Sequence, residues 1–441
     1  MRLLLYADDI VLLAERRRDL QDMLDIVTSY SKKWRFRVNP KKGKSEVMLF
    51  GRKPRKTKHE RKWCLAGVDI QETDSYKYLG VDLVSSLNFK KLKSRLVADA
   101  RKRLMLVWAM GMRRGELPVE HCCRVWNALV RPVLEYGAVV WGDVKWEEAE
   151  GVQREMGKMI LGCSSSMANE VVLGELGWWT LKARRDLLRL KFWGKIVCSM
   201  SPSRLVKQVY AHSRARYDAG HQNRWCKYTH ALLTELGMEE TWLQGKHDGD
   251  EKAWDKQLRE KIHVREEREW LERMQTKPKL RTYMTLKHEL TFEHYLTYDD
   301  IQARHVMTRL RGGTNELRIE TGRYPITNRD RRLEIHERIC LLCLSGEIED
   351  EKHIVLNCTV YEDLRKKMFD VVKRVMLKER EEIEDVLNTE IGKERIFREL
   401  MAARVEEYEA SAALCNVALA YCKAAMKRRK HIVVTYLDQK T

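Results

Sequence analysis

Two apolar runs of strand length, residues 3–6 and 10–14, lie at the start of the chain on either side of a short turn. Runs of this length next to a turn are typical of buried β-strands. A helical period follows, with apolar residues at Leu20, Met23, Leu24, Val27, Tyr30 and Trp34. Strand-like segments at 45–51, 63–70 and 76–83 then complete a β-β-α-β-β-β order, which predicts a small α+β unit over residues 1–84.

The pattern becomes helical after residue 89. Residues 89–141 carry helical stripes, and residues 146–200 add two or three more helices. Residues 251–275 predict a highly charged, solvated helix, and residues 361–430 predict two charged helices. The expected fold class is therefore mainly α with a small α+β N-terminal unit. The expected domains are 1–84, a helical domain at 85–200, a helical connector of unknown role at 201–300, and a basic, cysteine-containing region with C-terminal helices at 301–441.

The charge balance favours a polyanionic partner. The 441 residues include 84 Lys and Arg against 65 Asp and Glu, a net charge of +19. Residues 1–62 carry 18 basic and 8 acidic side chains, more than half of that excess. Such an excess is typical of proteins that bind nucleic acid, although a solvated, solubilising surface would also carry it.

Targeting signals are not evident. Met1 and Arg2 are followed by too few apolar residues for a secretory signal, and no apolar run approaches the ~20 residues that span a bilayer. The eleven cysteines are then expected as reduced thiols in an intracellular compartment, the nucleus or the cytoplasm, without a membrane partner.

Tyr6-Ala7-Asp8-Asp9 places two adjacent carboxylates between the two N-terminal apolar runs. Charges in such a setting are rare unless they are paired or bound to a metal. A strand–Asp-Asp–strand hairpin is one way to hold divalent metal ions for phosphoryl transfer. The alternative is an Asp-Asp type I′ turn that binds no metal.

The ordered motifs around this hairpin resemble the palm of a reverse transcriptase, and the closest match is the non-LTR (LINE-type) retrotransposon enzymes. The palm resemblance rests on the Asp pair, Asn39 and residues 44–50 and 78–81. Further segments resemble the helical thumb region of the same elements: residues 131–137 with Trp141, 160–162 and 175–178.

The resemblance implies an RNA-directed DNA polymerase that uses two magnesium ions. It assigns Asp8 as a direct magnesium ligand and Asp9 as the adjacent catalytic carboxylate. In the family another catalytic Asp and the fingers lie upstream of this hairpin, where this sequence has five residues. We therefore expect the C-terminal portion of such an enzyme, which alone neither polymerises nor holds magnesium.

The same resemblance assigns contacts with the template–primer, an RNA and DNA partner. Tyr6 would lie along the primer–template, and Lys44 would approach the incoming triphosphate. The strand turn that grips the primer would be formed by Tyr78, Leu79 and Gly80. A basic loop would contact backbone phosphates independently of base sequence, through Lys53, Arg55 and Lys56.

Cys340, Cys343, His353 and Cys358 follow a Cys-x2-Cys-x9-His-x4-Cys pattern. Three thiolates and one imidazole, with His and Cys on one helix face, predict a closed, structural zinc site, while free thiols beside a surface histidine are the alternative. His336 is a competing ligand that we expect outside the site. Enzymes of the resembling type carry a similar motif after a basic, nucleic-acid-binding segment, which here includes Arg323, Arg329, Arg331 and Arg332.

Three functional hypotheses remain open from the sequence. The chain is part of a reverse transcriptase completed by residues elsewhere, or a non-catalytic nucleic-acid-binding module with a structural zinc knuckle. The third is a product whose fold persists only locally. The oligomeric state is not predicted.

Overall fold

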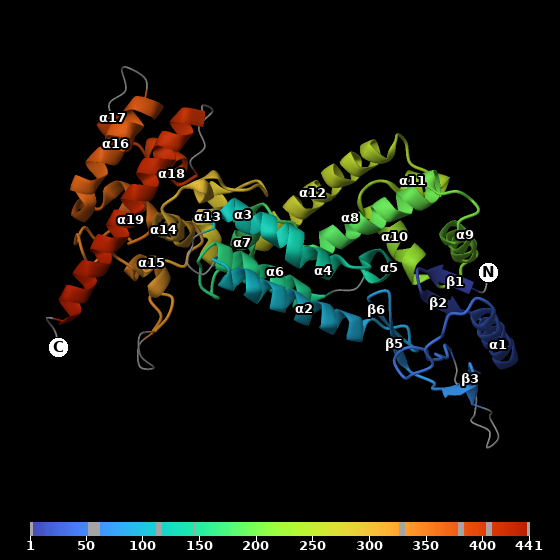
Figure 1. Cartoon of the computed structure of the whole chain (residues 1–441). Coiled ribbons are helices and arrows are strands. Elements are labelled where there is room, and N and C mark those ends of the chain that lie inside the picture. Colours follow the sequence, from blue (N-terminus) through green and yellow to red (C-terminus); the bar gives the residue numbers. More distant parts are fainter. Residues whose placement is uncertain are drawn as a thin grey trace. The chain divides into compact units, whose positions relative to one another are not determined.

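A computed structural model of the chain is mainly helical with a few short strand pairs, as the sequence predicted (Figure 1). The chain divides into two compact units, Met1–Ala98 (unit 1) and Asp99–Thr441 (unit 2). The helix α2 (Lys90–Ala109) contains the division. The residues that the structure describes are 3–51, 62–111, 117–143, 146–325, 331–377, 383–402 and 408–438.

The described residues of unit 1 form one long helix and six short strands before α2. Its strands form three separate antiparallel pairs, β1–β2, β3–β4 and β5–β6. The elements are β1 (Leu3–Tyr6), β2 (Asp9–Leu12), α1 (Arg17–Lys33), β3 (Trp63–Leu65), β4 (Val68–Ile70), β5 (Ser75–Tyr78) and β6 (Val81–Val84).

Two segments that were expected as single strands are hairpins. Residues 63–70 reverse direction at Ala66 and Gly67, which have φ of 54° and 81°. Residues 76–83 reverse at Leu79 and Gly80 in the same way, and both two-residue turns need the left-handed backbone that glycine adopts easily. The strand expected at 45–51 is also wrong, because in that segment Val47 makes an isolated bridge to Glu72 and no strand forms.

The core of unit 1 lies between α1 and the β3–β4 hairpin. It is built from the buried side chains of Leu24, Val47, Trp63, Leu65 and Ile70. The side-chain amide of Gln21 satisfies the backbone of Cys64 in both directions: it donates to the carbonyl oxygen at 2.9 Å and accepts from the N–H at 3.0 Å. This contact fixes α1 along the edge of β3.

The N-terminal hairpin is exposed, although its apolar sequence was expected to form buried strands. Leu5 and Tyr6 are each 64% exposed. Within the described residues β1 and β2 pair with each other and with no further strand, and Leu12 is the hairpin residue that packs against the core. The apolar pattern of β1 and β2 therefore fits a surface that this unit leaves uncovered.

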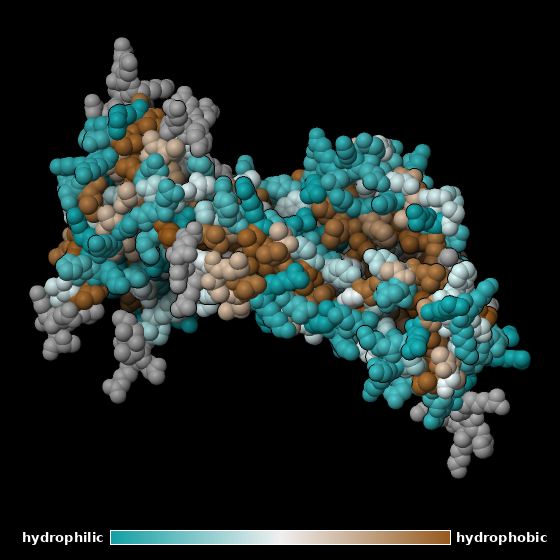
Figure 2. All heavy atoms as spheres, in the orientation of Figure 1, coloured by the Kyte–Doolittle hydropathy of each residue, from teal (hydrophilic) through white to brown (hydrophobic). Residues whose placement is uncertain are grey.

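Unit 2 is built from helices and short helical turns. In the region of α4 and α8, Figure 2 shows hydrophobic side chains on the face that it draws. The elements after α2 are α3 (Val119–Val125), η2 (Trp126–Val130), α4 (Arg131–Glu135), α5 (Ala138–Trp141), α6 (Glu147–Ile160), α7 (Asn169–Leu176), α8 (Leu181–Gly194), η3 (Lys195–Ser199), α9 (Leu205–Asp218), α10 (Arg224–Glu235), α11 (Glu239–Gln244), α12 (Glu251–Gln275), η4 (Pro278–Leu280), α13 (Arg281–Leu286), η5 (His294–Thr297), α14 (Ile301–Arg311), α15 (Arg318–Thr321), η6 (Ile335–Glu337), η7 (His353–Asn357), η8 (Thr359–Tyr361), α16 (Glu362–Met376), α17 (Ile383–Leu387), α18 (Glu390–Ala402) and α19 (Tyr408–Asp438).

The helix expected at 251–275 has those bounds, but the expectation that it is solvated is wrong. α12 packs along α8, and its inner face is buried at Trp254, Leu258, Ile262 and Trp270. These apolar residues share one face of the helix. Arg265 and Glu266 are buried as well, and Arg265 forms an ion pair of 2.8 Å with Asp186 of α8. Residues 361–430 differ as well: the structure has α16, α17, α18 and most of α19 where two helices were expected.

A cluster of buried charges joins α7, α14 and the segment before η5. The guanidinium of Arg311 lies 2.9 Å from Glu175 and 3.1 Å from Glu293, and the Arg311 and Glu175 side chains are both 0% exposed. Lys287 forms an ion pair with Glu293 in the same cluster. The Arg311 guanidinium also lies over the ring of Tyr295 at 5.2 Å. The cluster explains why segment 175–178 carries a glutamate in a buried helix.

Gly177 and Trp178, which follow Glu175 in the same segment, pack closely against neighbouring parts of the chain. Gly177 ends α7 with φ of 62°, and a Cβ atom there would lie 2.6 Å from the backbone nitrogen of Phe292. Trp178 stacks on Trp126 with ring centroids 5.3 Å apart. The motif of residues 175–178 therefore joins an ion pair, a glycine close approach and an aromatic stack in one turn of chain.

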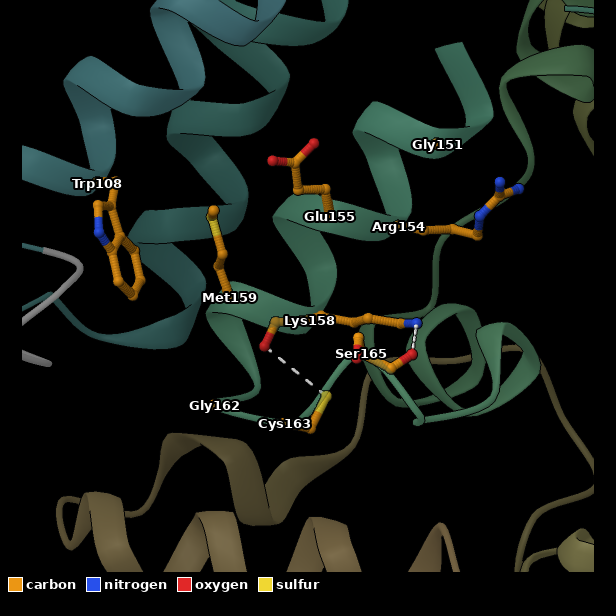
Figure 3. A pocket seen from close by; sticks show the side chains of 9 residues that line it. All are labelled: Trp108, Gly151, Arg154, Glu155, Lys158, Met159, Gly162, Cys163 and Ser165. Carbon is orange, nitrogen blue, oxygen red and sulfur yellow. Dashed lines mark hydrogen bonds between the residues drawn. The ribbon is translucent and has the colours of Figure 1, made fainter. Parts of the chain in front are cut away.

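A surface pocket of about 560 Å³ lies between the C-terminal part of α2 and α6 (Figure 3). Its lining residues are Trp108, Gly151, Arg154, Glu155, Lys158, Met159, Gly162, Cys163 and Ser165. In the described part of the chain, no helix has both the length and the apolar character that crossing a membrane requires.

Candidate functional site

Asp8 and Asp9 lie at the tip of the β1–β2 hairpin. Tyr6 pairs with Asp9, so the two-residue turn consists of Ala7 and Asp8, and Ala7 has φ of 51°. The turn expected at Asp8 and Asp9 therefore lies one residue earlier in the chain, because Asp9 already belongs to β2. Both carboxylates are exposed, and so is Tyr6.

Other residues of the motifs expected to form the palm lie near Asp9. The hydroxyl of Tyr76 donates a hydrogen bond of 2.8 Å to the carbonyl oxygen of Lys44. Burial raises the pKa of Tyr76, and the charges of Asp9 and Glu46 raise it further. The structure thus brings the end of the first hairpin, the Lys44 segment and β5 into one neighbourhood of unit 1.

The turn between β5 and β6 is held from α2. Arg95 donates to the carbonyl oxygen of Gly80 at 2.5 Å and to the carboxylate of Asp82 at 2.6 Å. Tyr78 lies at the end of β5, and Leu79 and Gly80 form the turn. Arg95 was missed in the sequence because its contacts connect a helix to a turn and follow no local motif.

The described residues do not complete a metal site around Asp8. Within them, the group of three or more potential ligands that converge is the Cys/His group of unit 2, and no such group includes Asp8 or Asp9. Two exposed carboxylates alone do not fit a two-metal centre, which requires ligands on several sides of each ion.

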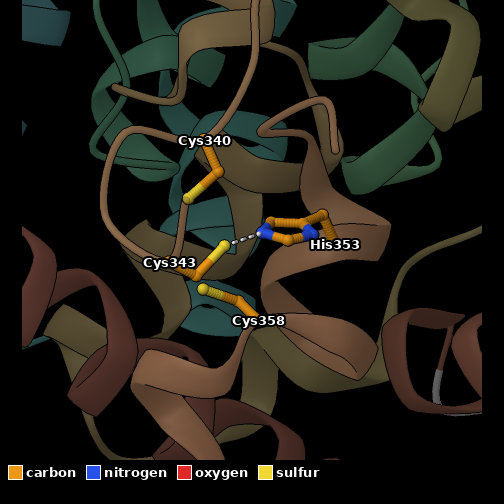
Figure 4. A group of neighbouring side chains, drawn as sticks. All are labelled: Cys340, Cys343, His353 and Cys358. Carbon is orange, nitrogen blue, oxygen red and sulfur yellow. Dashed lines mark hydrogen bonds between the residues drawn. The ribbon is translucent and has the colours of Figure 1, made fainter. Parts of the chain in front are cut away.

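The structure brings together Cys340, Cys343, His353 and Cys358 (Figure 4). Their potential ligand atoms all lie within 4.8 Å of one another. The edge of a tetrahedron with metal–sulfur bonds of ~2.3 Å is roughly 3.8 Å. The group therefore fits a tetrahedral zinc ion. His336 is exposed and outside the group.

Two structural elements present these ligands. Cys340 and Cys343 lie on a loop closed by an antiparallel bridge between Ile339 and Ile348, and the loop turns through Leu344 (φ 56°) and Gly346 (φ 79°). His353 begins the helical turn η7, and Cys358 follows directly after its end. His353 and Cys358 were expected along one helix face, but only His353 is within the turn.

Glu347 orients the imidazole. The Nδ1–H of His353 donates to the Glu347 carboxylate at 2.6 Å, and Nε2 lies 3.4 Å from the sulfur of Cys343. An acceptor on Nδ1 leaves Nε2 directed at the centre, as in many zinc sites. Burial lowers the pKa of His353, but the contacts with Cys340 and Glu347 outweigh it and raise the pKa to about 9.

The side chains of Cys340 and Cys358 interact through a hydrogen bond. A hydrogen bond with Cys358 lowers the pKa of Cys340 to about 3 and raises that of Cys358. Metal binding needs thiolates, and a cluster that stabilises one thiolate without metal has the required chemistry. Cys340 and Cys358 are buried, and Cys343 is partly exposed.

The loop of the centre is clamped by buried ion pairs. Glu349 receives two hydrogen bonds of 2.8 Å from Arg429 of α19, and Glu351 receives one of 2.7 Å from Arg281 of α13. The hydroxyl of Tyr421 donates to the carbonyl oxygen of Ile354 at 2.6 Å. Sequence reasoning missed Arg281 and Arg429, because their partners are 70 and 80 residues away.

Comparison with known proteins identifies the N-terminal segment. Residues 1–83 match the family described as reverse transcriptase (RNA-dependent DNA polymerase). A curated relative, the RNA-directed DNA polymerase from mobile element jockey of Drosophila funebris, is 29% identical over 143 residues. This chain is related to the reverse transcriptases of non-LTR retrotransposons.

The match covers 31% of the chain and 15% of the jockey polymerase. No solved structure matches the chain. The relationship confirms the resemblance inferred from the Asp8-Asp9 hairpin and the motifs after it. The Cys/His centre lies outside the segment that matches the reverse transcriptase family.

Two of the basic residues expected to bind nucleic acid form ion pairs within the chain. Arg323 contacts Glu320 at 2.8 Å, and Arg331 contacts Glu337 at 2.8 Å. Arg332 is exposed. The other residues of this expectation lie outside the described part of the chain: Lys53, Arg55, Lys56 and Arg329.

Proposed function

We propose that this chain is the nucleic-acid-holding part of an RNA-directed DNA polymerase of a non-LTR retrotransposon. The observation that carries the proposal is the reverse transcriptase match over residues 1–83, which contains the Asp8-Asp9 hairpin. The net charge of +19 and the basic segment around Arg323 and Arg332 support an RNA and DNA partner.

In this proposal Asp8 and Asp9 contribute two carboxylates to a magnesium site that residues outside the described part complete. Two observations support this: the described residues add no third acidic ligand, and the apolar face of β1–β2 is exposed. Unpaired strands with exposed apolar side chains are suited to extension by further strands of a larger sheet. The proposed arrangement would place Tyr6, Lys44 and Tyr78–Gly80 beside the primer–template.

The Cys/His group would hold a structural zinc ion. Cys340, Cys343, His353 and Cys358 fill all four positions of a tetrahedron, so none is left open for substrate. The ion would cross-link the 339–348 loop to both ends of η7, through His353 and Cys358. Glu347 would keep the imidazole in place. The basic segment immediately before this loop would then be presented to nucleic acid.

Primer extension tests the catalytic part of the proposal. With a primed RNA template, magnesium and deoxynucleotides, we expect no extension by the purified chain, because its Asp pair is incomplete. Extension products are resolved on a denaturing gel, with a complete reverse transcriptase as positive control. Extension that disappears on Asp8→Ala would show that the chain assembles a working site alone and would contradict the proposal.

A second candidate is a nucleic-acid-binding module without catalysis. It is favoured because the described residues hold a complete Cys/His tetrad but only an incomplete Asp pair. The two candidates differ when a palm fragment with the missing acidic residue is added in trans. The polymerase part gains extension that depends on Asp8, whereas the binding module gains none.

A further inference from the structure

Two lysines converge on one polar turn between α6 and α7. Lys158 of α6 donates a hydrogen bond of 2.7 Å to the carbonyl oxygen of Ser165, and Lys279 of η4 donates one of 3.0 Å to that of Ser166. The hydroxyls of Ser164 and Ser166 lie 2.7 Å apart, and all three serines are exposed. The turn therefore presents two ammonium groups beside exposed hydroxyls, which are groups that bind phosphate oxygens.

The charges of these two lysines lack close carboxylate partners. In the described part of the chain, neither ammonium forms an ion pair, whereas the neighbours Arg154 and Lys277 are paired with Glu147 and Glu170. The exposed surface around the turn thus combines paired cations with two that contact only neutral carbonyls. An incoming anion would gain both charges without first displacing a carboxylate.

The pKa values of the two lysines agree with an excess of positive charge around the turn. Burial lowers the pKa of Lys158. Arg154 and Lys277 lower it further, while Cys163 and Glu170 raise it. Burial also lowers the pKa of Lys279, and Arg323 and Lys158 add to it against Glu320. Lys158, Lys279 and Arg323 therefore interact as one group of like charges, which leads toward the basic segment before the Cys/His centre.

The pocket of about 560 Å³ adjoins the same turn, because Lys158 and Ser165 line it. Figure 3 shows Trp108 and Met159 toward one side of the pocket and the Lys158–Ser165 contact toward the other. Trp108 is partly exposed. An aromatic face beside a cationic turn is the combination that single-stranded nucleic acid uses, one for a base and one for its phosphate.

We propose that Lys158 and Lys279 bind a backbone phosphate of a single nucleic-acid strand, and that the adjoining unpaired base enters the pocket and stacks on Trp108. Glu155 also lines the pocket, but it is occupied by Arg101 at 3.6 Å and leaves the cationic side uncovered. The inference rests on the proposed nucleic-acid binding and adds a defined contact site to it. The site lies in unit 2, whereas the Asp8-Asp9 hairpin belongs to unit 1.

The first test measures binding of the full chain to fluorescein-labelled single strands of RNA and of DNA at several salt concentrations. For Lys158→Gln/Lys279→Gln we expect affinity to fall about tenfold and the salt slope to decrease by about one. Lys252→Gln/Lys256→Gln is the matched control, because it removes the same charge from exposed positions of α12. Equal affinity for the two double variants would overturn the proposal.

The base contact has its own test. Trp108→Leu should weaken binding to an ordinary oligonucleotide and leave binding to an abasic one unchanged, since the abasic strand has no base to stack. Equal losses for both oligonucleotides would refute the stacking role. Circular dichroism and thermal unfolding confirm that each variant is folded.

The outcome also separates this site from the broader proposal. If the wild-type chain binds neither RNA nor DNA, the proposed function fails and this site fails with it. If the chain binds but only Arg331→Gln/Arg332→Gln weakens binding, the proposed function stands and the Lys158–Lys279 site is refuted. A loss for both pairs supports a path from the pocket to the basic segment.

Discussion

Replacing Cys343 by serine should abolish zinc binding and destabilise the C-terminal part of unit 2. The purified chain is expected to hold about one zinc ion, and the variant nearly none, because three ligands do not close a structural site. Apparent zinc-binding free energies of ~10–16 kcal/mol in small zinc domains show how much folding such a site can support. The loop 339–348 and η7 connect to α13 and α19 through Glu351 and Glu349, so the loss should spread beyond the loop.

Zinc content per chain, measured by atomic emission after dialysis, and the thermal midpoint test this expectation. Cys198→Ser is a matched control, since Cys198 is an exposed cysteine outside the group. Chelator should lower the midpoint of the wild-type chain and of the control but not that of Cys343→Ser. Undiminished zinc in Cys343→Ser would refute the assignment of this ligand.

Arg311→Met should be among the most destabilising single substitutions in unit 2. It removes the cation that contacts both buried glutamates, Glu175 and Glu293, and leaves the ion pair of Lys287 with Glu293. Removing one partner of a buried ion pair costs ~3–5 kcal/mol, because the remaining charge loses its compensation. The additional loss of the hydrogen bond of 2.5 Å from Arg311 to the carbonyl oxygen of Met401 also detaches α18 from the cluster.

Chemical denaturation followed by circular dichroism measures this cost. Arg259→Met is the matched control: Arg259 pairs with Asp255 at 2.9 Å, but its side chain is 47% exposed. Exposed pairs contribute ~0–1 kcal/mol, so the control should unfold close to wild type. Adding Glu175→Gln to Arg311→Met should recover part of the loss. Equal unfolding free energies for Arg311→Met and Arg259→Met would show that the buried cluster stabilises the fold no more than an exposed ion pair does.

Local patterns predicted the helices well and the strands less well. The helix at 251–275 follows from unbroken helix-forming sequence, and its burial was missed because charged residues outnumber the apolar stripe of Trp254, Leu258 and Ile262. The hairpins of 63–70 and 75–84 were read as single strands because each turn is only two residues long. Gly67 and Gly80 were the available signals, since a glycine inside a strand pattern often marks a turn.

In the candidate sites, too, groupings of residues close in sequence could be predicted, whereas contacts between distant segments could not. The four Cys/His residues lie within 19 residues of chain, and their spacing alone predicted that they converge. The contacts of Arg429 with Glu349 and of Arg95 with Gly80 depend on how a helix packs against a distant loop or turn. The Lys427–Lys430 run illustrates the converse: Arg428 pairs with Asp363 and Arg429 with Glu349, so half of this basic run serves the fold.

Salt-dependent binding to a primed RNA template tests the central claim most directly. If the chain holds nucleic acid for a reverse transcriptase, its affinity should be measurable at low salt and should fall steeply as salt rises, in a linear log–log relation whose slope counts phosphate contacts. Competition with a polyanion that lacks bases distinguishes this binding from charge attraction alone. Absence of binding at low salt, or equal competition by that polyanion, would contradict the account.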